Sequence, residues 1–271
     1  MKIASFPFAP GRIIFERSLF ASYIVNFLGL SAHFSAIYYV PLYLQVRVTT
    51  VPRESIILNH DSDALQIVDN LSARDTGILM IPPMLGSVLG SVFGGRIMKR
   101  TGKYYRLTIS CLFLSVLAAL FLILSAGLFE FSQGLIIALF FSSFGIGATI
   151  TTTLISVIAN VDPIDQAVAT ACTYLFRSLG CTVGTSFAST VVQQVLRNQL
   201  RAHLDPGENA DKIVERVRQS LDYIKELAPH TRVIVIRCYE NATAAAFGLT
   251  LSFTFLAFIC SFWIREKRLS K

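Results

Sequence analysis

Apolar positions along the chain fall into long blocks that contain no Asp, Glu, Lys or Arg. A helix needs about 20 residues to cross the hydrocarbon core of a bilayer, so block length separates membrane helices from buried core helices. Five blocks are free of charge, and a sixth, residues 166–196, carries a single charge, Arg177. The pattern therefore predicts an all-α, polytopic membrane protein with a bundle of six transmembrane helices. The five uncharged blocks are 19–44, 77–95, 107–129, 131–161 and 241–264.

The charged and polar segments between the blocks define the expected organisation of the chain. A segment of residues 1–18 precedes a six-helix transmembrane domain, 19–264, and residues 265–271 form a tail. Residues 45–76 and 197–240 form the two long loops, and apolar residues at spacings of three and four between 213 and 227 predict a short amphipathic helix in the second. We expect the spans at about 19–44, 77–96, 107–129, 134–159, 167–195 and 242–264.

Composition supports a membrane protein and gives no sign of an enzyme. Of 271 residues, 53% are hydrophobic and 15% are charged, with a mean hydropathy of +0.58, whereas soluble domains carry about 25% charged residues. Phosphate-binding loops, nucleophile elbows and paired carboxylates are not recognisable, so we expect no enzymatic activity. The four histidines lack Cys or carboxylate at ligand spacing, and we expect neither a metal nor a cofactor.

The net charge of +7 comes from basic residues that cluster at particular ends of the predicted spans. Five of them, with no acidic residue, lie in the segment 96–106 between the second and third spans, and four more lie in the tail 265–271. Short basic loops stay cytoplasmic, so both termini are expected in the cytoplasm and both long loops in the lumen or exterior. This clustering favours a lipid bilayer, and not a nucleic acid, as the partner. Glycosylation triplets at Asn70 and Asn241 lie near the ends of the two loops.

A glycine and basic motif lies between the second and third predicted spans. Its residues are Gly95, Arg100, Gly102 and Lys103. The spacing resembles the loop signature Gly-x-x-x-Asp-Arg-x-Gly-Arg of the major facilitator superfamily, which occurs at this place in each six-helix half. Lys99 occupies the Asp position, so a gating contact made by that Asp is not expected here.

Three other segments carry a narrower resemblance, to fungal fourteen-span drug–proton antiporters and vacuolar basic amino acid transporters. They are 169–180 with 189–193, 38–45, and 77–82. The resemblance implies the carboxy-terminal six-helix half of a major facilitator fold, in a vacuolar or plasma membrane. It implies proton antiport of small solutes, either basic amino acids or drug-like compounds. A missing amino-terminal half or a second copy would complete the substrate path, and the alternative is a truncated, non-transporting membrane remnant or assembly partner.

Two residues inside the predicted spans are candidates for transport. Arg177 lies near the middle of its span, where a charge costs about 2.5 to 3.5 kcal/mol unless it is paired or hydrated. It either contacts substrate or a proton relay in a cavity, or donates to helix carbonyls and holds the bundle together. His33 could relay protons because its unperturbed pKa is near neutral, although we favour a packed neutral histidine.

Small residues and prolines in the second span make two further structural predictions. Glycines recur every four residues at Gly86, Gly90 and Gly94, which predicts close approach of a neighbouring helix. Pro82 and Pro83 are expected to bend the second helix because each removes a backbone donor.

Overall fold

The computed structural model describes residues 14–48, 77–78, 80–127, 132–203 and 229–267. All long elements in these ranges are helices, so the predicted all-α fold class is confirmed. Most of loop 45–76 and the amphipathic helix expected between 213 and 227 lie outside the described residues. The helices are α2 (Arg17–Val48), α4 (Ile81–Thr101), α5 (Tyr105–Gly127), α6 (Ser132–Asn160), α7 (Gln166–His203) and α10 (Pro229–Ser261).

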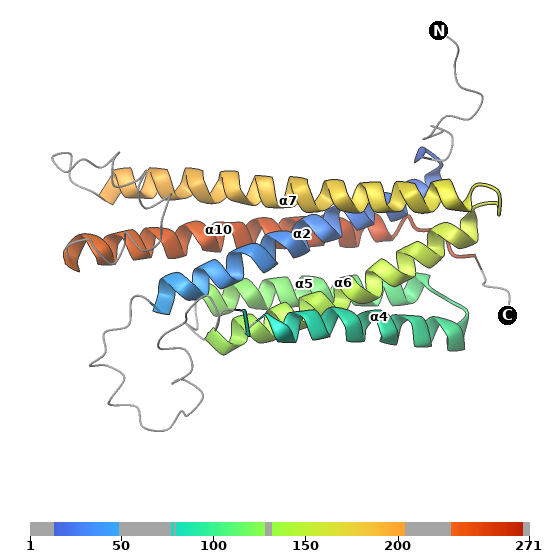
Figure 1. The fold of residues 1–271 in the computed structure, drawn as a ribbon, viewed down its shortest axis with the longest axis horizontal. Helices are drawn as coiled ribbons and strands as arrows, with labels where there is room; N and C mark the ends of the chain where they lie inside the picture. The colour runs from blue at the N-terminus through green and yellow to red at the C-terminus, as the bar shows by residue number, and fades with distance from the viewer. Residues whose placement is uncertain (1–13, 49–76, 79, 128–131, 204–228, 268–271) are drawn as a thin grey trace, which may run out of the picture.

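The six helices form an elongated bundle in which successive helices run in opposite directions (Figure 1). Helix α2 crosses the bundle obliquely and packs against α6, α7 and α10, while α4 packs against α6. The beginning of α2, the α4–α5 turn, the α6–α7 turn and the end of α10 all lie at one end of the bundle. The basic segment 96–106 and residues 265–267 are therefore neighbours.

Four helices are long and apolar enough to cross a membrane by length and composition, and α4 and α7 are outside this group. The four stretches are Leu19–Val46, Tyr105–Ala126, Gly134–Asn160 and Thr231–Ser261. Helix α4 contains several glycines and ends in basic residues, and α7 contains many hydroxyl and amide side chains. Both nevertheless run beside the other helices (Figure 1).

Helices α7 and α10 are longer than the spans that the sequence predicts. Helix α7 continues to His203, beyond the expected end near 195, and α10 begins at Pro229, before the expected start at 242. Loss of hydrophobicity marks the limit of a membrane-compatible segment but does not stop a helix, because charged residues such as arginine are good helix formers. Part of the expected loop 197–240 is thus helical.

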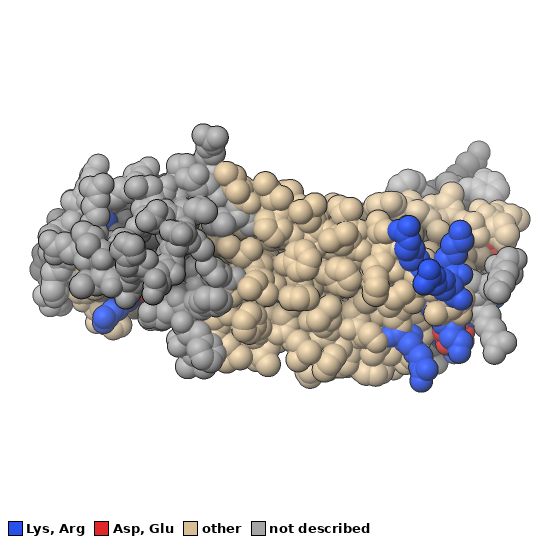
Figure 2. Space-filling view, turned by 90° about the horizontal axis from the view of Figure 1, so that it is seen from below, with Lys and Arg blue, Asp and Glu red and all other residues tan. Residues whose placement is uncertain are grey.

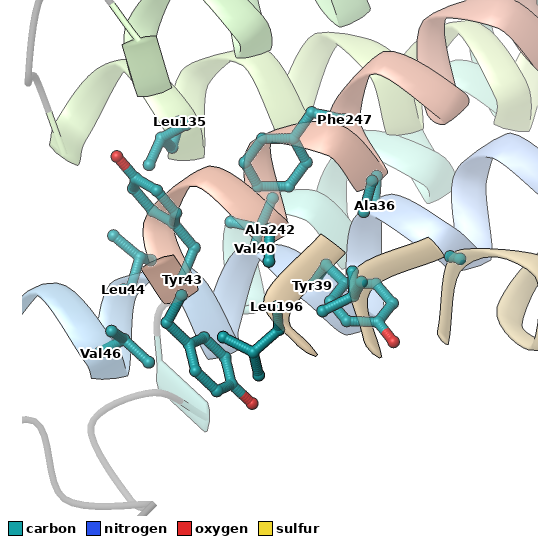
Figure 3. Packing of buried hydrophobic residues seen from close by; sticks show 14 of the residues in the cluster. Ala36, Tyr39, Val40, Tyr43, Leu44, Val46, Leu135, Leu196, Ala242 and Phe247 are labelled. Carbon is teal, nitrogen blue, oxygen red and sulfur yellow. The ribbon is translucent and has the colours of Figure 1, made fainter. Parts of the chain in front are cut away.

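The largest buried cluster lies toward the end of the bundle away from the basic residues. Figure 3 shows side chains of α2, α6, α7 and α10 meeting there, with Phe247 beside Tyr43 at a ring-centroid distance of 5.8 Å. The Tyr43 hydroxyl donates to the Ala126 carbonyl at the end of α5, over 2.8 Å. This cluster connects the helices that also position the interior polar residues described below.

Close packing of α4 on α6 confirms the prediction from the glycine series. A Cβ atom added at Gly86 would lie 2.6 Å from the Phe140 carbonyl oxygen, and one at Gly94 would lie 3.4 Å from Ala148 Cα. One at Gly90 would collide with the Phe144 carbonyl oxygen. At Gly86 and Gly90 only glycine permits this approach of the two backbones, whereas a Cβ at Gly94 would make an ordinary van der Waals contact.

The prediction for the prolines is wrong. Pro82 and Pro83 occupy the first turn of α4, directly after its first residue, Ile81. The first amide groups of a helix have no intrahelical acceptor, so a proline there sacrifices no hydrogen bond and its fixed φ favours the helical start. The prolines begin the helix and do not bend it.

Candidate functional site: an interior arginine network

Arg177 lies eleven residues after the first residue of α7 and turns its guanidinium toward α2 and α6. Its Nε donates to Asn26 Oδ1 over 3.0 Å, and one terminal nitrogen donates to the Ile150 carbonyl oxygen over 2.8 Å. At 1.5 Å per residue, this position is about 16 Å along the helix. The charge therefore lies among three helices, well away from either end.

Asn26 of α2 is the residue through which the three helices connect. Its side chain is only 2% exposed. The Oδ1 atom accepts from both Arg177 and Thr153 Oγ1, the latter over 3.2 Å, and Nδ2 donates to the Ser22 carbonyl over 2.8 Å. A buried amide costs free energy unless its donors and acceptors are paired, and these contacts largely satisfy Asn26.

The charge of Arg177 is balanced by no carboxylate in the part of the chain that the structure describes. The ring of Tyr174 also faces the guanidinium, with its centroid 5.2 Å from the guanidinium carbon. A guanidinium has five N–H donors, and two are engaged by Asn26 and Ile150. The side chain is partly exposed, so the remaining donors are available to a further acceptor.

A polar stripe follows Arg177 along the exposed face of α7. Apolar residues such as Leu179 and Phe187 share that face, at 46% and 57% exposed. Polar groups facing lipid are unfavourable, and polar residues in membrane helices mark protein contacts or water-filled paths. The stripe thus extends the polar site along the bundle. It consists of Ser178, Thr182, Ser186, Thr190 and Gln193, all exposed.

His33 lies on α2, seven residues after Asn26, and is 8% exposed. Its Nδ1 has no hydrogen-bond partner in the described part of the molecule, and its ring meets Phe34 edge-on at 6.0 Å. Ser143 Oγ of α6 is likewise buried without a partner. His33 is packed as expected for a core histidine, while its role as a proton relay stays a prediction.

The four motif residues lie at the basic end of the bundle and not beside Arg177. Gly102 adopts φ +66° and its amide donates to the Met98 carbonyl over 2.8 Å, which ends α4 with a left-handed cap. Glycine adopts this conformation without a steric penalty. Arg100 and Lys103 are exposed on either side of the cap, and a Cβ at Gly95 would meet nothing within 4 Å. Their gating role stays a prediction.

Sequence reasoning identified Arg177 but not its partner Asn26 or the stripe on α7. Asn26 is a single polar residue in an apolar block, and its side of the helix is known only once α6 and α7 are placed. The four-residue spacing of hydroxyl residues from Ser178 to Thr190 was a usable signal for the stripe. Among the described residues, no group of three His, Cys, Asp or Glu is arranged to hold a metal ion.

Comparisons with known proteins connect this arrangement to a transporter family. Residues 3–185 match the family model of the Major Facilitator Superfamily. The chain is 32% identical over 267 residues to the vacuolar membrane amino acid uptake transporter fnx2 of Schizosaccharomyces pombe, covering 98% of this chain and 42% of that protein. It is 27% identical over 266 residues to the multidrug resistance protein fnx1 of the same yeast, covering 97% and 46%.

A third relative and one solved structure extend the comparison. The chain is 30% identical over 203 residues to the vacuolar basic amino acid transporter 2 of Saccharomyces cerevisiae, covering 72% of this chain and 41% of that protein. Its fold is similar, with a TM-score of 0.52 and 17% identity, to a bacterial homologue of the human lysosomal transporter Spinster, covering 97% of this chain and 52% of that chain. The chain thus spans about half, or less, of the length of these proteins.

Proposed function

This chain belongs to the major facilitator superfamily, and on that basis we propose that it forms one six-helix half of a transporter of small solutes. Proton antiport is the proposed mechanism, with basic amino acids or drug-like compounds as substrates. The names of the relatives, which include amino acid and multidrug transporters, support this range. Vacuolar or plasma membrane is the proposed location, and the vacuolar names favour the first.

The observation that carries the proposal is a cation inside the bundle, at the start of an exposed polar stripe, that has no carboxylate partner among the described residues. Arg177 keeps free donors, and the stripe from Ser178 to Gln193 presents polar groups on an uncovered face of α7. In transporters of this kind, substrate sites lie near the bilayer midplane between two repeats, which rock about the site. The stripe and Arg177 would form one wall, and a second six-helix half the other.

A free guanidinium suits a substrate that carries a carboxylate. Arginine binds carboxylates through two parallel hydrogen bonds, and such charge-assisted contacts are about twice as strong as neutral ones. An α-amino acid offers this group, whereas many drug-like compounds do not. Arg177 therefore favours amino acids within the proposed substrate range.

Reconstitution of the purified 271-residue chain tests the proposal. Alone in liposomes, it is expected not to dissipate a proton gradient on addition of lysine or arginine, because one wall of the path is absent. Co-expression with the amino-terminal part of fnx2, up to the point where its similarity to this chain begins, is expected to give substrate-dependent proton flux. Flux by the chain alone, absent from empty liposomes, would show that two copies form the path.

Failure of both preparations has a distinct meaning. If the two pieces co-purify as a folded complex that binds substrate yet moves no protons, the antiport mechanism is wrong. If they co-purify but bind no substrate, the chain is an assembly partner or a non-transporting remnant.

The proposed topology places the basic end of the bundle in the cytoplasm. In a variant whose five native cysteines are replaced by serine or alanine, Lys103→Cys should react with a membrane-impermeant maleimide only from the cytoplasmic side of sealed vesicles. Arg197→Cys lies near the end of α7, at the opposite end of the bundle, and should react only from the other side. Labelling of both positions from one side would contradict the topology.

A further inference from the structure

Seven basic side chains gather at one end of the bundle, which we call the basic end. They come from the last two turns of α4, the turn after it, the beginning of α5 and the segment after α10, and every one is exposed. Figure 2 shows Lys and Arg concentrated there, next to a broad band of the surface that carries no charge. The residues are Arg96, Lys99, Arg100, Lys103, Arg106, Arg265 and Lys267.

Acidic residues at the basic end are fewer than the basic residues and form no ion pair with them in the described part of the chain. The described acids at this end are Asp162 and Asp165 in the α6–α7 turn, Glu266 beside the tail cations, and Glu16 just before α2. The surface therefore presents a strong positive field to whatever lies beside it.

Exposed aromatic residues locate the level of the membrane surface at this same end. Trp263 is 66% exposed and Phe262 is 52% exposed, and they lie two and three residues before Arg265. The Tyr105 hydroxyl donates to the Phe262 carbonyl over 3.4 Å, so the beginning of α5 lies beside them. Tryptophan and tyrosine concentrate at the headgroup level of bilayers, which places the neighbouring cations level with lipid phosphates.

The tail cations are held in place by Tyr104. Its buried hydroxyl donates to the Arg265 carbonyl over 2.7 Å and accepts from the Lys267 amide over 2.8 Å. Asn160 Nδ2 at the end of α6 also donates to this hydroxyl, over 3.0 Å. The backbone that carries Arg265 and Lys267 is thus fixed against α5 and α6, so these charges bind a ligand without first losing backbone freedom.

We propose that the basic end binds the headgroups of anionic phospholipids in the adjacent leaflet. Clusters of four to eight basic residues next to membrane helices attract anionic lipids, and each contributes about fivefold to the association constant. Seven cations beside an exposed tryptophan match this pattern, and lipid phosphates are the anions that occur at this depth. The proposal is independent of whether the chain transports a substrate.

The chain offers a direct readout, because Trp263 is its only tryptophan. Nanodiscs are prepared with either brominated phosphatidylserine or brominated phosphatidylcholine at the same mole fraction, the remainder being unbrominated phosphatidylcholine. Bromine quenches tryptophan fluorescence at short range, so the ratio of the two quenching efficiencies reports local enrichment of the anionic lipid. We expect a ratio well above one at low salt that declines as ionic strength rises.

Two variants with the same loss of charge separate a local site from a general effect of net charge. Arg106→Gln with Arg265→Gln removes two charges and should lower the relative association constant for phosphatidylserine by about 25-fold. Arg197→Gln with Arg237→Gln removes two exposed charges at the opposite end and should leave it unchanged. A ratio of one for the parent protein, or an equal fall in both variants, would overturn the proposal.

One further arm distinguishes the lipid from a free anion. Inorganic phosphate is added at constant ionic strength to nanodiscs that contain brominated phosphatidylserine. If the basic end binds headgroups in the leaflet, millimolar phosphate should not reduce the quenching. Full competition by phosphate would show a soluble anion site and would contradict binding to the bilayer.

Discussion

Replacement of Gly90 by alanine is expected to lower the thermal stability of the detergent-solubilised protein, whereas the same replacement at Gly95 should not. Both glycines lie in α4, five residues apart. A Cβ at position 90 would collide with the Phe144 carbonyl oxygen and approach Phe144 Cα to 3.0 Å. A Cβ at position 95 would meet nothing within 4 Å.

The collision at Gly90 cannot be relieved without moving a helix. The obstructing atoms belong to the backbone of α6 and cannot rotate away as a side chain could, so the two helices must separate. Separation would also disturb Gly147 of α6, whose own Cβ would collide with the Ser87 carbonyl on α4. Overpacking of this kind typically costs about 1 to 3 kcal/mol. Association of membrane helices depends mainly on such close packing, because lipid supplies no hydrophobic driving force between them.

The matched pair isolates packing from helix propensity. Alanine is favoured over glycine within a helix by about 1 kcal/mol, and this gain applies at both positions. The difference between Gly90→Ala and Gly95→Ala in melting temperature, followed by circular dichroism or by dye labelling of buried cysteines, therefore measures the helix contact. Equal melting temperatures for the two variants would show that α4 and α6 are not in the described contact.

Much of the fold could be predicted from the sequence because each membrane helix is marked by a continuous apolar block in its own segment. The five uncharged blocks and the block that contains Arg177 predicted the six helices, and the spacing of Gly86, Gly90 and Gly94 predicted a close contact before its partner was known. The resemblance to fungal vacuolar amino acid and drug transporters is confirmed by the family match and by relatives such as fnx2. These features depend on residues near one another in the chain.

What the sequence did not provide depends on contacts between distant segments. Asn26 and Thr153 are 127 residues apart, and only their packing brings them together. The error over Pro82 and Pro83 has a related cause, since hydrophobicity placed the start of the span at residue 77 while α4 begins at Ile81. The limits of an apolar block and the limits of a helix are set by different interactions.

Arg177→Leu is expected to insert normally, to lower the stability of the folded bundle, and to abolish transport when a complementary first half is supplied. Leucine removes an insertion penalty of about 2.5 to 3.5 kcal/mol. It also removes two hydrogen bonds from a charged donor, each worth about 1.5 to 3 kcal/mol. Asn26 Oδ1 would keep Thr153 as a donor, so the loss of stability should be moderate.

Arg177→Lys should restore only part of the stability and less of the transport. An ammonium group keeps the charge but is compact and cannot supply the planar set of donors that reaches Asn26 and Ile150 together. Any substrate carboxylate would likewise lose paired hydrogen bonds. Thermal stability in detergent and uptake by the reassembled transporter should therefore separate the charge of Arg177 from its geometry.

A double-mutant cycle with Asn26→Ala tests whether the hydrogen bond seen in the structure contributes to stability. Groups in direct contact show coupling energies of about 0.5 to 3 kcal/mol, so the destabilisation by Asn26→Ala and Arg177→Leu together should be smaller than the sum of the two. Arg197→Leu, at an exposed position near the end of the same helix, is the control and should couple with neither. If Arg177→Leu is at least as stable as the parent, shows no coupling to Asn26 and leaves transport intact, the arginine faces lipid and extends to the membrane surface. In that case the interior network does not form the wall of a substrate path.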